Sequence, residues 1–342
     1  MGDVLRFGLV GAGAIGQTYL SVIAANSAID LVGVADNRTA VAAAAAESAA
    51  CTAYPDAAAL IDDARPDGIV ICVPPVDHFA IANAAIEAGV ATLCEKPLCL
   101  TVPEAHTLRD TAEAKNALFT MASKFRYVDD VVRGKAIISS GILGDIIILE
   151  NVFTGRVDMS NRWNADPAVS GGGVLIDNGT HAVDIVRYLI GPVAEVNAMT
   201  GRHVQNLAVE DTATLNIRTA CGVDARVELS WSYHNPEDSF VAVYGTRGTL
   251  CIGWSRSRYK RHEDAEWVTF GNGYDKQAAF AAQIGNFCAA MTGNETLLID
   301  NNDAVASVEV IDAAYESLRI GGWIDVQDHV RNIGSTERST EK

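Results

Sequence analysis

The feature of this sequence that most constrains its fold is the glycine-rich segment 11–16, Gly-Ala-Gly-Ala-Ile-Gly, in its flanking context. The segment follows a short apolar run over residues 5–10 that is typical of a strand. It opens a stretch over 17–25 in which apolar residues recur at helical spacing. A strand, a glycine turn and a helix in this order form the context in which such a pattern predicts a dinucleotide-binding turn. Without that context, the same glycines would indicate no more than a loop.

Each glycine of the turn has a separate predicted role. Gly11 allows the tight turn, Gly13 lets the backbone approach a pyrophosphate, and Gly16 lets the helix pack closely on the strand. The first main-chain amides of the helix, at Ala14 and Ile15, then face the phosphates with the favourable end of the helix dipole.

A spaced acid strengthens this prediction. The apolar run 31–35 reads as the next strand and ends at Asp36, 20 residues after Gly16, where a carboxylate can accept both ribose hydroxyls of the adenosine. Asp36 therefore favours NAD over NADP, because a 2′-phosphate would meet it with like charge. Asn37 and Arg38 complete this part of the predicted cofactor site, and Arg38 keeps NADP open, since an arginine can accept that phosphate.

Length, charge and cysteine content bound the class of protein. A chain of 342 residues favours two domains. A formal net charge of −17 without a long basic run argues against nucleic acid and anionic membranes as partners, and leaves a small-molecule substrate. The seven cysteines are scattered without a CxxC pair, which argues against a disulfide framework or a structural zinc site and fits a cytoplasmic protein. The start of the chain lacks the pattern of a signal peptide, and no apolar run is long enough to cross a membrane.

Residues 1–123 alternate between strand-like and helix-like segments. Short, nearly continuous apolar strands between helices predict a doubly wound parallel sheet covered on both faces, the Rossmann type of nucleotide-binding domain. The expected strands are 4–10, 30–35, 68–73, 91–94 and 117–121, and the expected helices are 14–26, 39–49, 56–63, 76–88 and 102–115.

Residues 124–342 have a different pattern and are predicted to form a second α/β domain for substrate binding and oligomerisation. After a connecting helix over 126–139, the segments 211–219 and 223–231 alternate apolar and polar residues, which predicts a large, predominantly antiparallel open sheet. Helices near 171–190, 276–291 and 302–319 can cover its apolar face. The polar tail from about 328 is expected to be frayed.

Two clusters of functional side chains follow predicted parallel strands. Val73, Pro74 and His78 come after one strand, and Glu95 and Lys96 come after the next. Ligands of open parallel sheets bind beyond the carboxyl ends of the strands, so both clusters are predicted to join the glycine turn at one edge. For His78, capping of the following helix is an equal alternative, and Lys96 before a proline also fits an exposed turn.

A third cluster lies in the predicted helix after the glycines 171–173. Asp177 and His181 are four residues apart and share one helix face, with Asp184 three residues further on. A carboxylate beside an imidazole fixes its tautomer and supports its protonated form, which suits a general base. A polar helix face and a metal site are the alternatives. No metal is predicted, because the sequence supplies neither an HExxH helix nor paired cysteines as further ligands.

Other residues offer weaker signals for a substrate site. Arg126, Arg162 and Trp163, together with Arg156, lie in segments that could line such a site, although surface roles fit each equally well. Trp163, Trp231 and Trp254 are predicted to fill the core or an interface more often than to stack on a ligand.

With these motifs in place, the chain resembles the Gfo/Idh/MocA family, which includes glucose–fructose oxidoreductase and inositol dehydrogenase. The resemblance rests on the GAGAIG turn, on Asp36, on Glu95-Lys96-Pro97 and on the helix with Asp177, His181 and Asp184. It implies a Rossmann domain, a second predominantly antiparallel domain and an active site between them. It also implies that Lys96 binds the reacting hydroxyl and the nicotinamide ribose, and that His181 is the base with Asp177 as its partner. Asp184 would support these residues from behind, and the Lys96–Pro97 peptide bond would be cis.

These observations lead to one principal hypothesis and two alternatives. The principal one is an NAD-dependent dehydrogenase that oxidises a ring secondary hydroxyl of a sugar, a cyclitol, or an amino-sugar or nucleotide-sugar derivative. The alternatives are a glycosidase that uses NAD as a transient oxidant and a catalytically silent NAD(P)-binding regulator. A homo-oligomer is expected, because the alternating sheet would leave one broad face uncovered, and the family resemblance implies a tetramer in preference to a dimer.

Overall fold

The computed structural model describes the main chain of residues 4–340 and the side chains up to residue 334. The chain forms two compact units. One contains the residues up to Lys124 together with Lys276–Val305, and the other contains Phe125–Asp275 and the residues from Ala306 onward. The sequence prediction divided the chain into two consecutive segments after residue 123; in these units the first segment ends at Lys124, and the chain later returns to the first unit over Lys276–Val305.

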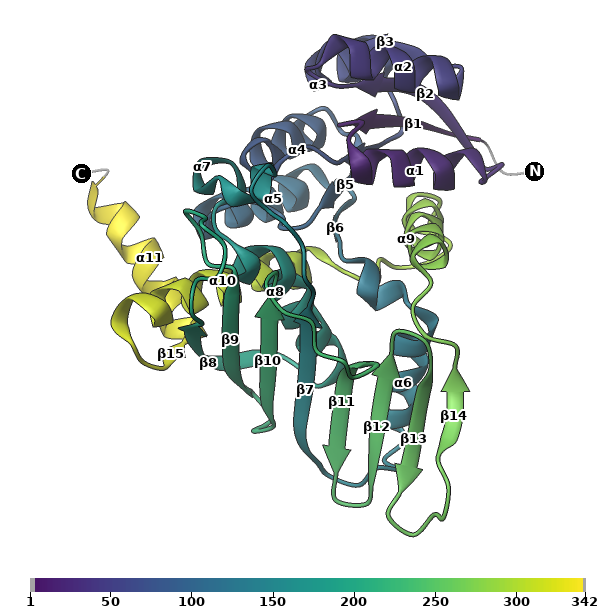
Figure 1. Ribbon diagram of the computed structural model, residues 1–342. Helices are drawn as coiled ribbons and strands as arrows, with labels where there is room; N and C mark the ends of the chain where they lie inside the picture. The colour runs from purple at the N-terminus through teal and green to yellow at the C-terminus, as the bar shows by residue number, and fades with distance from the viewer. Residues whose placement is uncertain (1–3, 341–342) are drawn as a thin grey trace. The chain divides into compact units, whose positions relative to one another are not determined.

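The first unit is built on a six-stranded parallel sheet with the order β3-β2-β1-β4-β5-β6 (Figure 1). This is the strand order of a doubly wound dinucleotide-binding fold, and the carboxyl ends of all six strands lie at one edge. The strands are β1 (Leu5–Val10), β2 (Ile29–Ala35), β3 (Thr52–Tyr54), β4 (Gly68–Ile71), β5 (Ala91–Glu95) and β6 (Phe119–Ala122). The helices between them are α1 (Ala14–Ala24), α2 (Thr39–Ala49), α3 (Ala57–Ala59), α4 (His78–Glu87) and α5 (Val102–Lys115).

Helix α9 (Lys276–Met291) also belongs to the first unit, and its apolar spacing explains why. Phe280, Ile284 and Phe287 recur at helical spacing and are buried in the same core as Tyr19 and Phe7. The ring centroids of Tyr19 and Phe280 are 4.9 Å apart, and those of Phe7 and Phe287 are 5.9 Å apart. The sequence showed this apolar stripe, but the stripe does not say which sheet it covers.

The second unit is built on a nine-stranded sheet with the order β14-β13-β12-β11-β7-β10-β9-β8-β15. Its neighbouring strands are antiparallel except for β7 and β10, which pair in parallel. The strands are β7 (Ile146–Thr154), β8 (Val193–Thr200), β9 (Thr212–Thr219), β10 (Asp224–Ser230), β11 (Ser239–Gly245), β12 (Gly248–Gly253), β13 (Ser257–Arg261), β14 (Val268–Gly271) and β15 (Ile324–Asp325).

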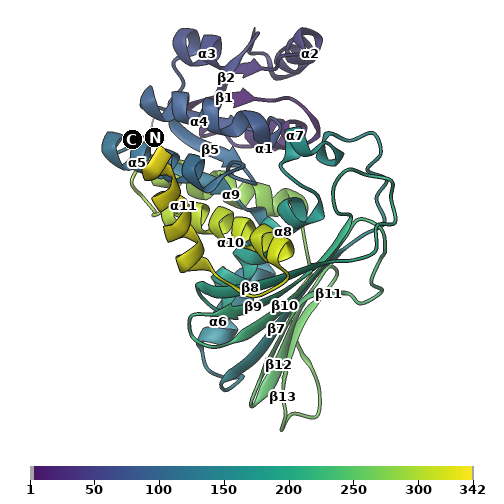
Figure 2. The ribbon, with the colours of Figure 1, turned by 90° about the vertical axis from the view of Figure 1, so that its left-hand side faces the viewer.

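Helices cover one face of this sheet. They are α6 (Asp129–Ser139), α8 (Val174–Leu189) and most of α10 (Asn301–Ile320), which lie on one side of the strands in Figure 2. Strand β10 alternates exposed polar with buried apolar residues, as the sequence predicted, and Val227 and Leu229 are buried while Arg226 and Glu228 are exposed. In the part of the chain that the structure describes, no helix packs on the opposite face (Figure 2).

One prediction for the end of the chain was wrong. The tail was expected to be frayed, but α11 (Val326–Thr340) is helical. Asp325 accepts a hydrogen bond from the Asp328 main-chain N–H at 2.8 Å, and His329 contacts Asp312 of α10 at 2.6 Å, so the start of the helix is capped and held. The helix predicted near 171–190 is confirmed as α8, and a short helix, α7 (Pro167–Ser170), precedes it and ends at Gly171, which adopts a φ of +80°. Among the helices in the described residues, none is long and apolar enough to span a membrane.

Candidate active site

The glycine turn lies at the carboxyl edge of the first sheet and needs glycine at two positions. Gly11 has a φ of +90°, and a Cβ there would lie 2.7 Å from the main chain of Cys72. A Cβ on Gly16 would lie 2.1 Å from the carbonyl oxygen of Gly11. The first glycine therefore lets β1 and the segment after β4 approach each other, and the second lets α1 start directly over the turn.

The amino end of α1 fits a pyrophosphate group. No side chain caps this end, and the first turn contains no acidic residue, so its first amides are left for an anion. A Cβ on Gly13 would find no atom nearer than the Arg38 Nη2 at 4.0 Å, which leaves open space above the turn. Ala14 is exposed and Ile15 is half-buried beside this space. The segment thus has room for a pyrophosphate, and its role in cofactor binding stays a prediction.

Asp36 follows β2 and connects the turn to Arg38. Its Oδ2 accepts a hydrogen bond from the Ala12 N–H at 3.0 Å and one from the Arg38 Nη2 at 3.0 Å. Its Oδ1 accepts from the main-chain N and from the Nε of Arg38, both at 2.9 Å. Burial would raise the pKa of Asp36, but the bonds from Arg38 and Ala12 outweigh it and hold that pKa below its ordinary value. Asp36 is therefore a fixed carboxylate, with Asn37 and Arg38 exposed beside it.

His78 connects two loops of the same edge from the inside. It is 1% exposed, and its ring Nδ1 lies 2.7 Å from the carbonyl oxygen of Pro97 and its Nε2 lies 2.9 Å from that of Val73. Burial lowers the pKa of His78, and the bonds to the two carbonyl groups oppose that shift. The side chain thus lies beneath the half-buried Val73 and Pro74 and acts on the cofactor site through the loops that it holds.

The segment after β5 places Lys96 at the same edge, on a buried acidic residue. Glu95 accepts a hydrogen bond from the Tyr19 hydroxyl at 2.9 Å and one from the Lys96 main-chain N–H at 3.1 Å. Tyr19 in turn accepts a bond from the Gln283 Nε2 of α9 at 2.6 Å. Burial raises the pKa of Glu95, and the charges of Lys96 and Lys124 oppose it in part. The Lys96–Pro97 peptide bond is cis, as the resemblance implied.

In the second unit, Glu210 anchors the helix that carries the proposed base. Its Oε1 accepts hydrogen bonds from the main-chain N–H groups of Gly173 and Leu175 and from the Tyr315 hydroxyl, each at 3.0 Å. Its main-chain carbonyl accepts a bond from the Val174 N–H at 2.9 Å. A negative charge at the amino end of a helix is also stabilised by the helix dipole. The sequence analysis missed Glu210, because no local pattern connects it to a helix that starts 36 residues earlier.

Asp177, His181 and Asp184 occupy successive turns of α8, as predicted. Asp177 is half-buried in the first turn, His181 is 6% exposed, and Asp184 is fully buried. The ring centroid of Phe125 lies 5.1 Å from that of His181 with the planes at 80°, and the ring of Phe153 lies at 6.5 Å. His181 therefore sits among aromatic rings, in surroundings that limit the access of water.

The predicted substrate residues separate into two groups. Arg126 is 3% exposed and forms an ion pair with Asp184, with its Nη2 2.7 Å and its Nε 2.8 Å from the Asp184 Oδ1. It also lies over the ring of Tyr188. Arg126 and Asp184 thus hold α8 from the interior. Arg162 and Trp163 are exposed in the loop before α7, and Arg156 is exposed nearby in sequence.

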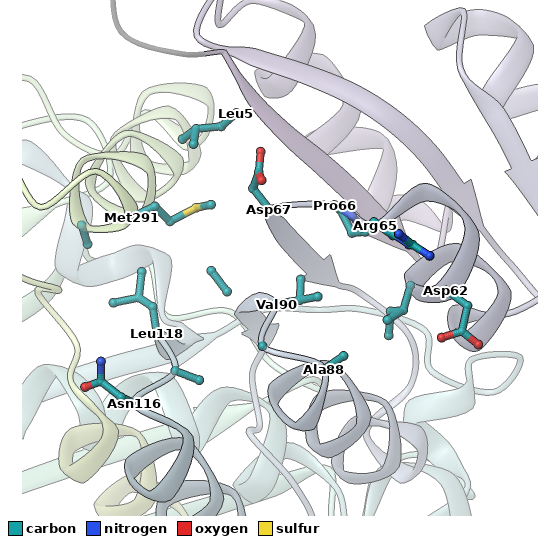
Figure 3. A pocket seen from close by; sticks show the side chains of 15 residues that line it. Leu5, Asp62, Arg65, Pro66, Asp67, Ala88, Val90, Asn116, Leu118 and Met291 are labelled. Carbon is teal, nitrogen blue, oxygen red and sulfur yellow. The ribbon is translucent and has the colours of Figure 1, made fainter.

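A hollow of about 870 Å³ lies elsewhere on the first unit (Figure 3). Leu5, Asp67, Val90 and Leu118 line it, and each of them lies at or beside the amino end of a strand. It is therefore at the edge of the sheet away from the glycine turn, where nucleotides do not bind in this fold. Within residues 4–334, no group of three or more His, Cys, Asp or Glu side chains is placed to hold a metal ion.

Comparisons with known proteins agree with this arrangement. A family model described as an oxidoreductase family with an NAD-binding Rossmann fold matches residues 5–123, and a model of the GFO/IDH/MocA C-terminal domain matches residues 131–251. The chain is 27% identical to the rhizopine catabolism protein MocA of Rhizobium meliloti, over 92% of this chain and 95% of that protein. It is 26% identical to the inositol 2-dehydrogenase of Rhizobium meliloti strain 1021, over 92% and 97%.

A solved structure of levoglucosan dehydrogenase in complex with NADH and levoglucosan has the same fold. It superposes with a TM-score of 0.87 and 23% sequence identity, and the match covers 94% of this chain and 99% of that one. Together with the two family models, the strand order and the glycine turn lead to one assignment: the chain belongs to the Gfo/Idh/MocA family of NAD-binding oxidoreductases.

Proposed function

We propose that this protein is an NAD-dependent dehydrogenase that oxidises a ring secondary hydroxyl of a sugar, a cyclitol or an amino-sugar derivative to a ketone. The observation that carries the proposal is the position of Lys96. It directly follows β5, at the strand edge that also carries the glycine turn and Asp36, and its main chain is held by the buried Glu95. The main chain that carries this lysine is thereby held at the edge where the fold binds its cofactor.

The chemistry divides between the cofactor and the chain. When bound, the nicotinamide supplies the hydride acceptor. The imidazole of His181 takes the proton of the substrate hydroxyl as its C–H bond breaks, and the Lys96 ammonium group stabilises the negative charge that develops on the oxygen. Asp177, one turn before His181 on α8, supports the imidazolium. A ketone, a proton and a reduced cofactor are the balanced products.

The substrate class follows the names of the relatives. Inositol 2-dehydrogenase and levoglucosan dehydrogenase are both named for saturated-ring substrates. The names of these relatives do not favour the two alternatives, a glycosidase and a catalytically silent regulator. A phosphorylated or nucleotide-linked substrate would need arginines to bind its charges, but Arg126 is already paired with Asp184. An uncharged ring polyol therefore fits better than a nucleotide-linked one.

The proposed assembly is a homo-oligomer, a tetramer in preference to a dimer. The face of the nine-stranded sheet opposite α8 carries exposed polar and aromatic groups, among them Glu150, Arg226 and Tyr244. Such a face suits a hydrated interface between copies of the chain. A monomeric mass by light scattering at micromolar concentration would contradict this. The cytoplasm is the proposed compartment, because all seven cysteines are free.

A substrate panel tests the proposed function. Purified protein with NAD is mixed with inositol isomers, free sugars, sugar phosphates and nucleotide sugars, and the absorbance of NADH is followed. We expect NADH formation with at least one uncharged ring polyol and weaker activity with the phosphorylated and nucleotide-linked compounds. Activity confined to nucleotide sugars would contradict the substrate class, and no activity with any ring hydroxyl would contradict the function.

A further inference from the structure

We infer that Trp254 is the platform on which the substrate ring stacks, and that the substrate therefore presents a face of C–H bonds rather than a face of hydroxyls. This inference rests on the proposed function and specifies its substrate class. Trp254 directly follows β12 and is 40% exposed. The sequence alone favoured a core or interface role for it.

The main chain on both sides of Trp254 is fixed. Its N–H donates to the carbonyl oxygen of Asp238 at 2.9 Å, and its own carbonyl accepts from the Tyr274 N–H at 3.0 Å. Its ring packs on Phe240, with centroids 4.7 Å apart, and against Tyr274 at 5.6 Å with the planes at 83°. A tryptophan residue that stays 40% exposed while its ring packs this closely on two other rings is a rigid platform.

This platform and the proposed base have aromatic neighbours in common. Phe125 contacts both, with its centroid 6.2 Å from that of Trp254 and 5.1 Å from that of His181. Phe153 bridges the same two residues at 6.1 Å and 6.5 Å. The indole and the imidazole therefore belong to one aromatic cluster, in which two rings contact both of them. A ring stacked on Trp254 can direct a hydroxyl toward His181.

The other tryptophans of the second unit have different surroundings. Trp163 is 46% exposed in the loop before α7, and Trp231 is 3% exposed and belongs to the core. Trp267 lies under the guanidinium of Arg258 at 4.5 Å, and Trp323 lies under that of Arg218 at 5.3 Å. Trp254 is the partly exposed tryptophan that shares an aromatic cluster with His181, within the residues that the structure describes.

The chemistry of stacking selects the substrate. The face of an indole is negative, and C–H bonds next to oxygen carry a partial positive charge, so a ring face of C–H bonds stacks on it favourably. Equatorial hydroxyls then point outward, where hydrogen-bonding groups can reach them. A ring with axial hydroxyls on both faces would have to desolvate one of them against the indole.

The test compares Trp254→Leu and Trp254→Phe with the wild type on the most active ring polyol of the panel. We expect Trp254→Leu to raise KM about 3- to 10-fold, the range that aromatic contacts of this kind account for. Trp254→Phe should give a smaller increase, and kcat and NADH affinity should change less than about twofold. Trp323→Leu is the matched control, an exposed tryptophan outside the cluster, and should behave as the wild type.

A second measurement reports binding without turnover. In the wild type with NADH bound, addition of the ring polyol should change the tryptophan fluorescence, and this change should be lost in Trp254→Phe and kept in Trp323→Leu. A KM within twofold of the wild type in Trp254→Leu, or an unaltered fluorescence change in Trp254→Phe, would overturn the inference while the proposed function stands. If Trp254→Leu does not fold, Trp254→Phe decides by both measurements. A wild type inactive on every ring polyol would instead contradict the proposed function.

Discussion

The hydroxyl of Tyr19 in α1 donates a hydrogen bond to the Oε1 of Glu95 at the end of β5, at a distance of 2.9 Å. Both side chains are buried, and the Oε2 of the same carboxylate accepts the Lys96 main-chain N–H. A single carboxylate therefore connects the helix that starts at the glycine turn to the proposed catalytic lysine. Burial raises the pKa of Glu95, so its charged form costs stability.

Glu95→Gln should make stability less dependent on pH. The pKa of Glu95 is higher in the folded than in the unfolded protein. As the pH rises above 4.5, the ordinary value for glutamate, the unfolded chain therefore loses this proton before the folded one does. The free energy of unfolding of the wild type then falls with pH until the folded pKa is passed. Glutamine does not titrate, so the stability of the variant does not fall with pH for this reason. The unfolding midpoint of the variant, relative to that of the wild type, should therefore rise as the pH increases.

The quantity to measure is the slope of the unfolding midpoint against pH. The midpoint at a single pH is less informative, because the glutamine amide can keep its carbonyl oxygen toward Tyr19 or Lys96 but not both and therefore loses one hydrogen bond at every pH. Glu150→Gln is the matched control, since Glu150 also accepts a tyrosine hydroxyl, that of Tyr244 at 3.2 Å, on an exposed sheet face. Urea midpoints are measured from mildly acidic to neutral pH. Parallel slopes for Glu95→Gln and the wild type would contradict the cost assigned to burial.

NAD should bind more tightly than NADP, because the Asp36 carboxylate is held as an anion by Ala12 and Arg38 where a 2′-phosphate would lie. Asp36→Ser should lower the ratio of the NADPH dissociation constant to the NADH dissociation constant about tenfold or more. Arg38→Ala should raise this ratio, because it removes the nearest cation. Fluorescence titration of both reduced cofactors measures the ratio. Tighter binding of NADPH by the wild type would reject this role for Asp36.

Glu210→Ala should lower stability and turnover together while cofactor affinity is kept. The change leaves the N–H groups of Gly173 and Leu175 and the Tyr315 hydroxyl without their acceptor, which should cost about 1–3 kcal/mol of unfolding free energy. Because α8 carries His181, kcat should also fall. Glu210→Gln should recover part of both losses, and Glu228→Ala on the exposed face is the control. A loss of stability with unchanged kcat would limit Glu210 to a structural role.

His181→Ala should lower kcat roughly 10²- to 10⁴-fold, the usual contribution of a positioned acid or base. Its NAD affinity should barely change, because the glycine turn and Asp36 belong to the other unit. Lys96→Ala should weaken both catalysis and cofactor binding, and Asp177→Asn should be milder than either. The wild-type kcat/KM for oxidation should rise with pH through an ionisation in the neutral range typical of histidine, and that limb should vanish in His181→Ala. Turnover near the wild-type value in His181→Ala would refute the mechanism.

The sequence predicted the parts of the fold that local patterns encode. The glycine turn and the alternation of strand-like and helix-like segments predicted the doubly wound parallel sheet of the first unit, and strict apolar–polar alternation predicted β9 and β10. Strands β13 and β14 were missed, because most of their residues are half-buried or exposed at the edge of the sheet and carry little apolar alternation. The placement of α9 depends on which core accepts its apolar stripe, which is a tertiary property.

The candidate site shows the same division. Residues next to strand ends, such as Asp36 and Lys96, were predictable because the topology brings strand ends together. Partners distant in sequence were not, and the Tyr19–Glu95 bond, the Glu210 anchor and the Arg126–Asp184 pair all join residues with no local signal. The exposed fraction of Trp254 likewise depends on four neighbouring rings from different segments.

The stoichiometry of NADH tests the central claim most directly. With the best ring polyol of the panel and excess NAD, the amounts of substrate consumed, ketone formed and NADH formed are measured in one stopped reaction. A dehydrogenase should yield one ketone and one NADH for each substrate molecule, with no smaller sugar released. Substrate cleavage without net NADH formation, or a reaction that depends on an added transition metal, would contradict the account.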